Sequence, residues 1–190
     1  ADQLNASLDF GNRSGNPHRW EGFLAEDGIL NTIWANHYRA ITNANIMIDG
    51  FTQINPANAT ETAQLKRYKG DAHLARAFYY HDLVKRFAKA YNPATASNDP
   101  GVPLVLTYDV SGQPARASVK AVYDQILLDL GEAKTSLAGI TGVQGATRFT
   151  EDVVTALEAR VKLNMEDWAG AKTAAEQLIN GGKYPLINSE

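Results

Sequence analysis

The chain has 190 residues and no cysteine, and its 18 basic and 21 acidic side chains give a net charge of −3 at pH 7. This length suffices for one sizeable core, and the balanced charge argues against nucleic acid or an anionic membrane surface as a partner. The missing cysteine excludes disulfides, thiolate zinc sites and cysteine nucleophiles, and no apolar run is long enough to span a bilayer.

The start of the chain is expected to hold a loop and then a helix. Residues 1–19 are polar and contain glycine and proline, so we expect a loop-rich lead-in. From Trp20 to Ile48 apolar side chains recur mostly three or four residues apart, which is the period of a helix. Asp27 and Gly28 are expected to break or bend this helix.

A second helix is predicted from about Glu61 to Lys89. Asn58 and Glu61 have the three-residue spacing of a capping box, which favours a helix start there. Apolar side chains form two adjacent stripes along the segment, so the helix should be buried over a wide face. Its lysines and arginines fall on the remaining turns, where we expect a solvated face.

Three aromatic residues follow one another in this helix. Phe78, Tyr79 and Tyr80 span about 200 degrees around a helix, so they cannot all face one ligand. At least one must belong to the core. We expect the cluster to serve packing, with one ring reaching a partner surface as the alternative.

Arg76 lies in the same helix among alanines and aromatics. A buried guanidinium needs a carboxylate or backbone carbonyls as partners. We predict a structural ion pair, with Asp49 and Asp129 as the candidate carboxylates.

A long irregular loop is predicted at about residues 91–117. It holds four of the seven prolines, and loops of this length are usually functional or disordered. A short extended segment is expected within residues 102–110. Ser118 then has the position of an N-cap, and the helix that follows should stop near Gly139.

Residues 150–182 are predicted to form two antiparallel helices joined by a tight turn. Thr150 and Asp167 begin the two helices, and Gly181 and Gly182 end the second. The first helix should carry its apolar face on Val153, Val154, Leu157, Val161 and Leu163. The second should bury Trp168, Ala171, Ala174, Ala175, Leu178 and Ile179. This pattern indicates a tetratricopeptide-like unit, so the fold class expected is all-α, a stack of antiparallel helix pairs.

Four segments in this order resemble the N-terminal helical half of the SusD/RagB family of outer-membrane glycan-binding lipoproteins. They are GDAHLARAFYYHDLVKRF, DPGVPLVLT, ARASVKAVYDQILLDLGEAKTSL and TRFTEDVVTALEARVKLNMEDWAGAKTAAEQLINGGKYPL. The resemblance covers about residues 20–186. The positions that match family motifs include Arg76, Tyr79, Tyr80, Arg116 and Trp168, for which it implies structural roles.

The resemblance also implies how the chain is organised. We expect residues 1–190 to be a single N-terminal helical domain of a longer protein, with residues 20–190 as the helical stack. It implies a surface-exposed lipoprotein of the outer membrane, attached by a lipid anchor that is absent from this chain.

The sequence favours a binding protein over an enzyme. The four histidines, at positions 18, 37, 73 and 81, show no metal-ligand spacing, and no cofactor motif occurs. The carboxylate pairs Glu26–Asp27 and Glu151–Asp152 are adjacent residues at helix starts, unlike the opposed acids of a glycosidase. We therefore predict no metal, no cofactor and no catalysis.

Two groups of residues meet the needs of a sugar site, which are an exposed aromatic ring and polar groups on a loop. The first group is Asn16, His18, Arg19 and Trp20. The second is Tyr91, Asn92, Asn98 and Tyr108. The alternative is that Trp20 docks the first helix and Tyr108 plugs a groove.

The leading hypothesis is a non-catalytic scaffold that helps to capture oligosaccharides or polysaccharides and pass them to a SusC-like TonB-dependent porin. The rival hypothesis is a tetratricopeptide-like module that binds a protein or peptide and has no glycan role. A glycosidase would require two carboxylates about 5 to 10 Å apart across a cleft.

Overall fold

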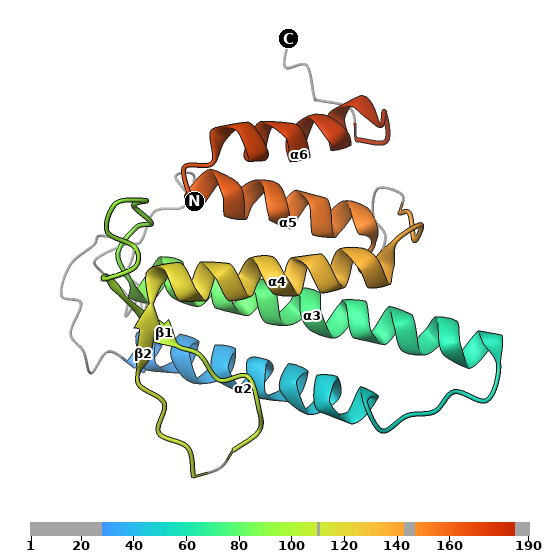
Figure 1. Cartoon of the computed structure of the whole chain (residues 1–190), viewed down its shortest axis with the longest axis horizontal. Helices are drawn as coiled ribbons and strands as arrows, with labels where there is room; N and C mark the ends of the chain where they lie inside the picture. Colours follow the sequence, from blue (N-terminus) through green and yellow to red (C-terminus); the bar gives the residue numbers. More distant parts are fainter. Residues whose placement is uncertain (1–27, 110, 143–146, 185–190) are drawn as a thin grey trace, which may run out of the picture. The chain divides into compact units, whose positions relative to one another are not determined.

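The computed structural model describes residues 28–109, 111–142 and 147–184. These residues form five helices and two short strands (Figure 1): α2 Gly28–Phe51, α3 Ala59–Phe87, β1 Pro100–Pro103, β2 Arg116–Ser118, α4 Val119–Leu137, α5 Glu151–Asn164 and α6 Trp168–Asn180. The chain divides into two compact units, residues 1–36 and 37–190, and the boundary falls inside α2. In the first unit the described residues are the first two turns of α2, where the Thr32 hydroxyl donates to the Gly28 carbonyl.

The second unit is a stack of helices. Successive helices run in opposite directions (Figure 1), and α3 packs on α4, α4 on α5, and α5 on α6. This arrangement confirms the predicted all-α class of antiparallel helix pairs. The predicted first helix is confirmed from Gly28 onwards and runs on to Phe51, whereas residues 1–27, including the expected lead-in, lie outside the described residues.

The helix starts follow from local capping, which explains why the sequence predicted them well. The Glu61 amide donates to the Asn58 side-chain oxygen at 2.9 Å, and the Glu61 carboxylate accepts from the Asn58 side-chain amide and from the Ala57 backbone. Ser118 and Asp167 accept in the same way from backbone amides three residues later. These bonds satisfy donors that a helix start leaves without partners.

Thr150 differs from the prediction in one respect. It stands at the N-cap position of α5, but its hydroxyl makes no capping hydrogen bond. The carboxylate of Glu151 instead accepts from the backbone amide of Gly139, at the end of α4. The start of α5 is thus tied to the preceding helix.

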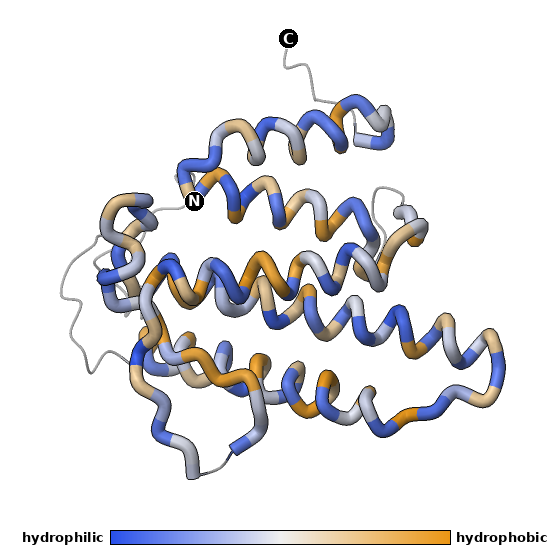
Figure 2. The backbone as a smooth tube through the Cα atoms, in the orientation of Figure 1, coloured by the Kyte–Doolittle hydropathy of each residue, from blue (hydrophilic) through white to orange (hydrophobic). Residues whose placement is uncertain are grey.

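The core lies mainly between α3, α4 and their neighbours. Apolar and polar residues alternate along the helices in Figure 2, so each helix buries one face and exposes another. Among the described residues, no helix combines the length and the apolar character that crossing a membrane requires. The largest fully buried side chains are Tyr80, Ile41, Leu74, Leu83, Ile126 and Leu137.

The aromatic cluster of α3 is divided between core and surface. Tyr80 is fully buried, whereas 46% of Phe78 is exposed, and Tyr79 lies between these extremes. The expectation that at least one ring belongs to the core is confirmed by Tyr80. Tyr68, which the helical period predicts on one buried stripe with Tyr79, is 42% exposed, so that part of the prediction is wrong.

The expected burial of Trp168 is wrong. This side chain is 63% exposed, and Leu163 and Ile179, also expected on buried faces, are 52% and 45% exposed. In the described part of the chain α6 packs against α5 alone, so only the α5-facing positions Ala171 and Ala174 are buried. The apolar residues were predicted correctly as helical, but the periodicity does not say which face has a neighbour.

A buried ion pair joins α3 to α4. Two guanidinium nitrogens of Arg76 donate to the two carboxylate oxygens of Asp129 at 2.9 and 2.7 Å, so Asp129 is the partner among the two predicted candidates. A third guanidinium nitrogen donates to Asn45 of α2, and His73 bonds Asp129 at 2.8 Å. Burial alone would raise the pKa of Asp129, but the hydrogen bonds from His73 and Arg76 outweigh it and hold the pKa below its ordinary value.

We predict that Arg76→Met destabilises the chain by about 3 to 5 kcal/mol, because it leaves the Asp129 carboxylate buried without its main partner. Urea unfolding followed by circular dichroism measures this change. The control is Lys120→Met, which breaks the exposed Lys120–Asp124 pair and should leave the midpoint unchanged. Equal losses in the two variants would contradict the prediction.

A close approach of α3 to α4 depends on Gly70. A Cβ atom there would lie 2.5 Å from Cγ of the buried Leu137, which is closer than packing allows. We predict that Gly70→Ala destabilises the fold by about 1 to 3 kcal/mol through overpacking. The matched variant Gly131→Ala has open space around its new methyl group and should stabilise α4 by about 0.5 to 1 kcal/mol. Thermal unfolding of both variants tests the opposite signs.

Candidate functional site

The connection between α3 and α4 is the predicted long loop, and the structure shows that it is partly ordered. It contains the antiparallel pair β1–β2, with Pro100 opposite Ser118 and Pro103 opposite Arg116. The extended segment expected within residues 102–110 is present, but it begins at Pro100 and ends at Pro103. The other described residues of the connection form turns or irregular segments, and side chains from the helices hold the part that follows β1.

Helices α2 and α3 hold the segment after β1 through its backbone. The Tyr80 hydroxyl donates to the Val105 carbonyl and accepts from the Val105 amide, both at 2.7 Å. The Asn45 side chain donates to the same carbonyl at 2.8 Å, and the Tyr38 hydroxyl donates to the Pro103 carbonyl at 2.8 Å. Burial raises the pKa of Tyr80 to about 12, so this hydroxyl keeps its proton at physiological pH.

Arg116 joins the two ends of the connection. Its Nε donates to the Gly101 carbonyl at 2.6 Å, and Nη2 donates to the Phe87 carbonyl at the end of α3 at 2.7 Å. One side chain therefore ties β2 to β1 and to the preceding helix.

The segment before β1 is held against the start of α4. The Val119 and Lys120 amides donate to the carbonyls of Asp99 and Ala96, so the turn occupies donors of the first turn of α4. The Asp99 carboxylate accepts from Lys89 and Thr95, and these bonds hold its pKa below the ordinary value. The path of this segment is thus fixed at both ends.

The structure separates the members of the second predicted sugar site. The half-buried Tyr91 packs edge to face on Tyr123 of α4, with ring centroids 5.0 Å apart. Asn98 is exposed on the turn before β1, and Asn92 accepts from the Ala94 amide. Figure 1 shows the segment before β1 and the segment between β1 and β2 on opposite sides of the strand pair, so Tyr108 belongs to a different surface. The first predicted site, Asn16, His18, Arg19 and Trp20, lies outside the described residues.

Tyr108 projects from the segment between β1 and β2. It is 59% exposed, so the alternative that it plugs a groove is wrong. A cavity of about 330 Å³ lies in the same segment and is lined by Leu104, Val105, Leu106, Thr107, Asp109, Gly112, Gln113 and Pro114. The Asp109 carboxylate accepts from the amide and hydroxyl of Ser111, which lowers its pKa and keeps it ionised. The segment between β1 and β2 thus carries an exposed ring, a carboxylate and an amide, which are the groups that suit a sugar.

The sequence pointed to Tyr80 and Arg116 but not to two other residues that hold this surface in place. Asn45 is fully buried and Tyr38 lies mostly inside, yet their partners are 60 and 65 residues away. The sequence did offer one signal for Asn45: it lies on a helix next to the apolar positions Ile41 and Ala44, where a polar side chain would be buried and would need a partner. Asp109 and Gln113 carried no signal beyond their place in a loop.

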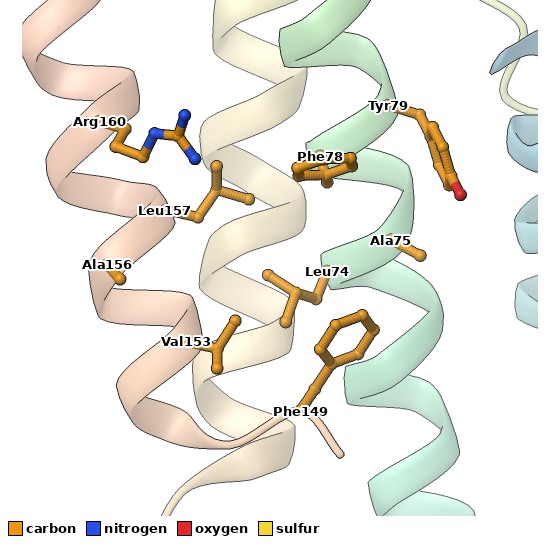
Figure 3. Close-up of a pocket in the computed structure, with 9 residues that line it drawn as sticks. All are labelled: Leu74, Ala75, Phe78, Tyr79, Phe149, Val153, Ala156, Leu157 and Arg160. Carbon is orange, nitrogen blue, oxygen red and sulfur yellow. The ribbon is translucent and has the colours of Figure 1, made fainter. Parts of the chain in front are cut away.

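A second concave surface lies between α3 and α5, above α4 (Figure 3). This α3–α5 groove has a volume of about 470 Å³ and is lined by Leu74, Ala75, Phe78, Tyr79, Phe149, Val153, Ala156, Leu157 and Arg160. In the figure, Phe78 and Phe149 lie between the two helices, whereas Tyr79 points toward α2. None of the lining residues carries a carboxylate, so this groove lacks the acid pair that a glycosidase requires.

The two helix-start carboxylates of α5 are also occupied. Asp152 accepts from Lys183 and Tyr184, and Glu151 accepts from Gly139. The histidines of the described residues bond different side chains: His37 bonds Asp82, His73 bonds Asp129 and His81 bonds Asn164. In the ranges that the structure describes, no three metal-ligating side chains come together.

The fold and these surfaces define a helical-repeat scaffold that presents a long, anchored loop. Residues 5–163 match the sequence profile of the SusD-like family described as "starch-binding associating with outer membrane". The match covers most of the chain, which therefore belongs to the SusD-like family.

Individual relatives agree with this assignment. The chain is 28% identical over 160 residues to SusD-like protein P38 of Formosa agariphila, which covers 82% of this chain and 27% of that protein. A putative sugar binding protein of Bacteroides vulgatus is 26% identical, with a TM-score of 0.77 over 89% of this chain and 36% of its own. A laminarin binding SusD-like protein is 25% identical, with a TM-score of 0.62 over 77% of this chain and 29% of its own. The chain thus spans about a third or less of the length of these relatives.

We predict that Tyr80→Phe loosens the segment after β1. The change leaves the Val105 amide without its acceptor, at a cost of about 1 to 3 kcal/mol. Hydrogen exchange should speed up at residues 104–109 more than in α3 or α4. Tyr79→Phe, on the neighbouring position with its ring contact to His37 kept, is the control. Unchanged exchange at Val105 in Tyr80→Phe would show that the hydroxyl does not anchor the loop.

Proposed function

We propose that this chain forms the helical part of a longer, non-catalytic SusD-like protein that captures oligosaccharides or polysaccharides at the bacterial outer membrane. The observation that carries the proposal is the family match over residues 5–163, whose description names starch binding and the outer membrane. The laminarin binding relative supports a glycan ligand for this fold. Transfer of the glycan to a SusC-like TonB-dependent porin, and attachment to the cell surface by a lipid anchor, complete the proposed role.

Within the described residues, the segment between β1 and β2 is the proposed contribution to the glycan site. Tyr108 offers an exposed ring for the apolar face of a sugar, and Asp109 and Gln113 offer acceptors and donors for its hydroxyls. The hydrogen bonds of Tyr80, Asn45 and Tyr38 hold the backbone of this segment before the ligand arrives. Less ordering is then required on binding, which favours affinity.

The rival function, a protein or peptide scaffold without a glycan role, predicts that Trp20 and Tyr108 are buried beside an open groove lined by polar groups. Trp20 lies outside the described residues. Tyr108 is exposed and the α3–α5 groove is lined almost wholly by apolar side chains. These observations favour the glycan proposal for the loop surface.

We predict that Tyr108→Ala weakens binding to starch or laminarin by about 5- to 10-fold, because loss of one stacked ring removes roughly 1 kcal/mol or more. Affinity electrophoresis in gels containing each polysaccharide, followed by calorimetry, measures the change. Tyr68→Ala is the control, since Tyr68 is also exposed but lies on α3.

Equal retardation of Tyr108→Ala and the unmodified chain would remove this loop from the glycan site. The prediction requires that the unmodified chain binds at least one of the two polysaccharides, so absence of binding to both would contradict it. Circular dichroism of each variant confirms that the fold is kept.

A further inference from the structure

The segment between β1 and β2 carries negative charge without a compensating positive charge. Residues 104–115 contain one charged side chain, Asp109, and no lysine, arginine or histidine. Asp109 lines the cavity of about 330 Å³ in this segment, and the other described lining side chains with polar groups, Thr107 and Gln113, are uncharged. The described lining of the cavity is therefore net negative.

The Asp109 carboxylate is held in place as an anion. The Ser111 amide and the Ser111 hydroxyl both donate to its Oδ1, each at 2.9 Å. These hydrogen bonds lower the pKa of Asp109, so its charge is present at physiological pH. Gly112 packs on the same carboxylate, because a Cβ atom there would lie 2.9 Å from Oδ2. The turn thus fixes both the position and the charge of this group.

The arginine that follows the segment is directed elsewhere. Arg116 lies at the start of β2, and its guanidinium donates to the carbonyls of Gly101, Phe87 and Pro100. Arg116 is not among the described residues that line the cavity. Its donors therefore serve the backbone of β1 and the end of α3, and they do not pair with Asp109.

Helix α2 adds a second carboxylate on the side that holds the loop. Tyr38 and Asn45 donate to the Pro103 and Val105 carbonyls, so their face of α2 is turned toward the loop. Asp49 lies four residues after Asn45, which places it on the same face, and it is exposed. The charge that this face of α2 adds beyond Asn45 is thus negative as well.

This distribution of charge distinguishes between classes of glycan. The hydroxyl groups of an uncharged sugar can donate to a carboxylate, and such charge-assisted hydrogen bonds are stronger than those between neutral groups. Proteins bind carboxylate and sulfate groups mainly through arginine and lysine. A uronic acid or a sulfate ester at this cavity would bring a second negative charge close to Asp109 without such a partner, and like charges repel.

From these observations we propose that the segment between β1 and β2 selects uncharged glycans, and that Asp109 excludes glycans that carry uronic acids or sulfate esters. The proposal rests on the proposed glycan function and adds the class of glycan to it. The ring of Tyr108 can cover the apolar face of a sugar of either class, so it contributes affinity, whereas Asp109 contributes the discrimination. Asp49 reinforces the exclusion from α2.

The test compares glycans that share one backbone and differ in charge. Laminarin and chemically sulfated laminarin form one pair, and starch and carboxymethyl starch form the other. Calorimetry with the 190-residue chain at low salt should show about 10-fold weaker binding of the charged member of a pair than of the uncharged member. Added salt should narrow this difference, because it screens the repulsion.

Two substitutions separate the effect of charge from the effect of shape. Asp109→Asn removes the charge and keeps an oxygen that can accept from Ser111, so it should reduce the difference to about 3-fold or less. Asp109→Lys reverses the charge, so sulfated laminarin should then bind at least as tightly as laminarin. Glu132→Gln and Glu132→Lys are the matched controls, since they change the net charge equally at an exposed position of α4 and should keep the difference. Circular dichroism checks the fold of each variant.

Equal binding of the charged and uncharged members by the unmodified chain would overturn the selection of uncharged glycans and leave the glycan function in place. A difference that Asp109→Lys leaves unchanged would also overturn it, because the bulk of the added groups would then be the cause. Tighter binding of a chitosan oligosaccharide than of a laminarin oligosaccharide of equal length would assign Asp109 to an ammonium group instead. Absence of binding to both laminarin and starch would contradict the glycan prediction itself, and this proposal with it.

Discussion

The buried pair of Arg76 and Asp129 is the interaction on which the arrangement of the helices depends. Taking two charges out of water costs several kcal/mol per ion, and that cost is recovered only when geometry and further hydrogen bonds are good. Here the contact is bidentate. His73 also bonds the Asp129 carboxylate, and Asn45 accepts a hydrogen bond from the third guanidinium nitrogen of Arg76. Because the pair admits few alternative geometries, it fixes how α3 and α4 lie against each other and where α2 joins them.

The same network extends from the helical core to the loop. Asn45 accepts from Arg76 through its oxygen and donates to the Val105 carbonyl through its nitrogen, so one amide joins the ion pair to the loop backbone. Tyr80, one turn beyond Arg76 on α3, contacts the same residue of the loop. The order of the loop surface is therefore a property of the helix packing, even though the loop itself contains only two short strands.

Features that depend on nearby residues could be predicted from the sequence, and those that depend on distant neighbours mostly could not. The caps at Asn58, Ser118 and Asp167 act within three residues, and the sequence places all of them correctly. The apolar residues around Arg76 in the sequence indicated that its guanidinium would be buried and would need a carboxylate partner. The exposure of Trp168, the role of Asn45 and the α3–α5 groove depend on which helix faces which, and the spacing of apolar residues carries no such information.

The loop is held through backbone carbonyls. The side chains of Tyr38, Asn45, Tyr80 and Arg116 all donate to main-chain oxygens of the connection between α3 and α4 or of its flanks. A carbonyl oxygen is present whatever side chain its residue carries. Side chains next to these anchored carbonyls can therefore change while the backbone there keeps its path. The shape of the loop near its anchors is thus set independently of the side chains that would contact a ligand.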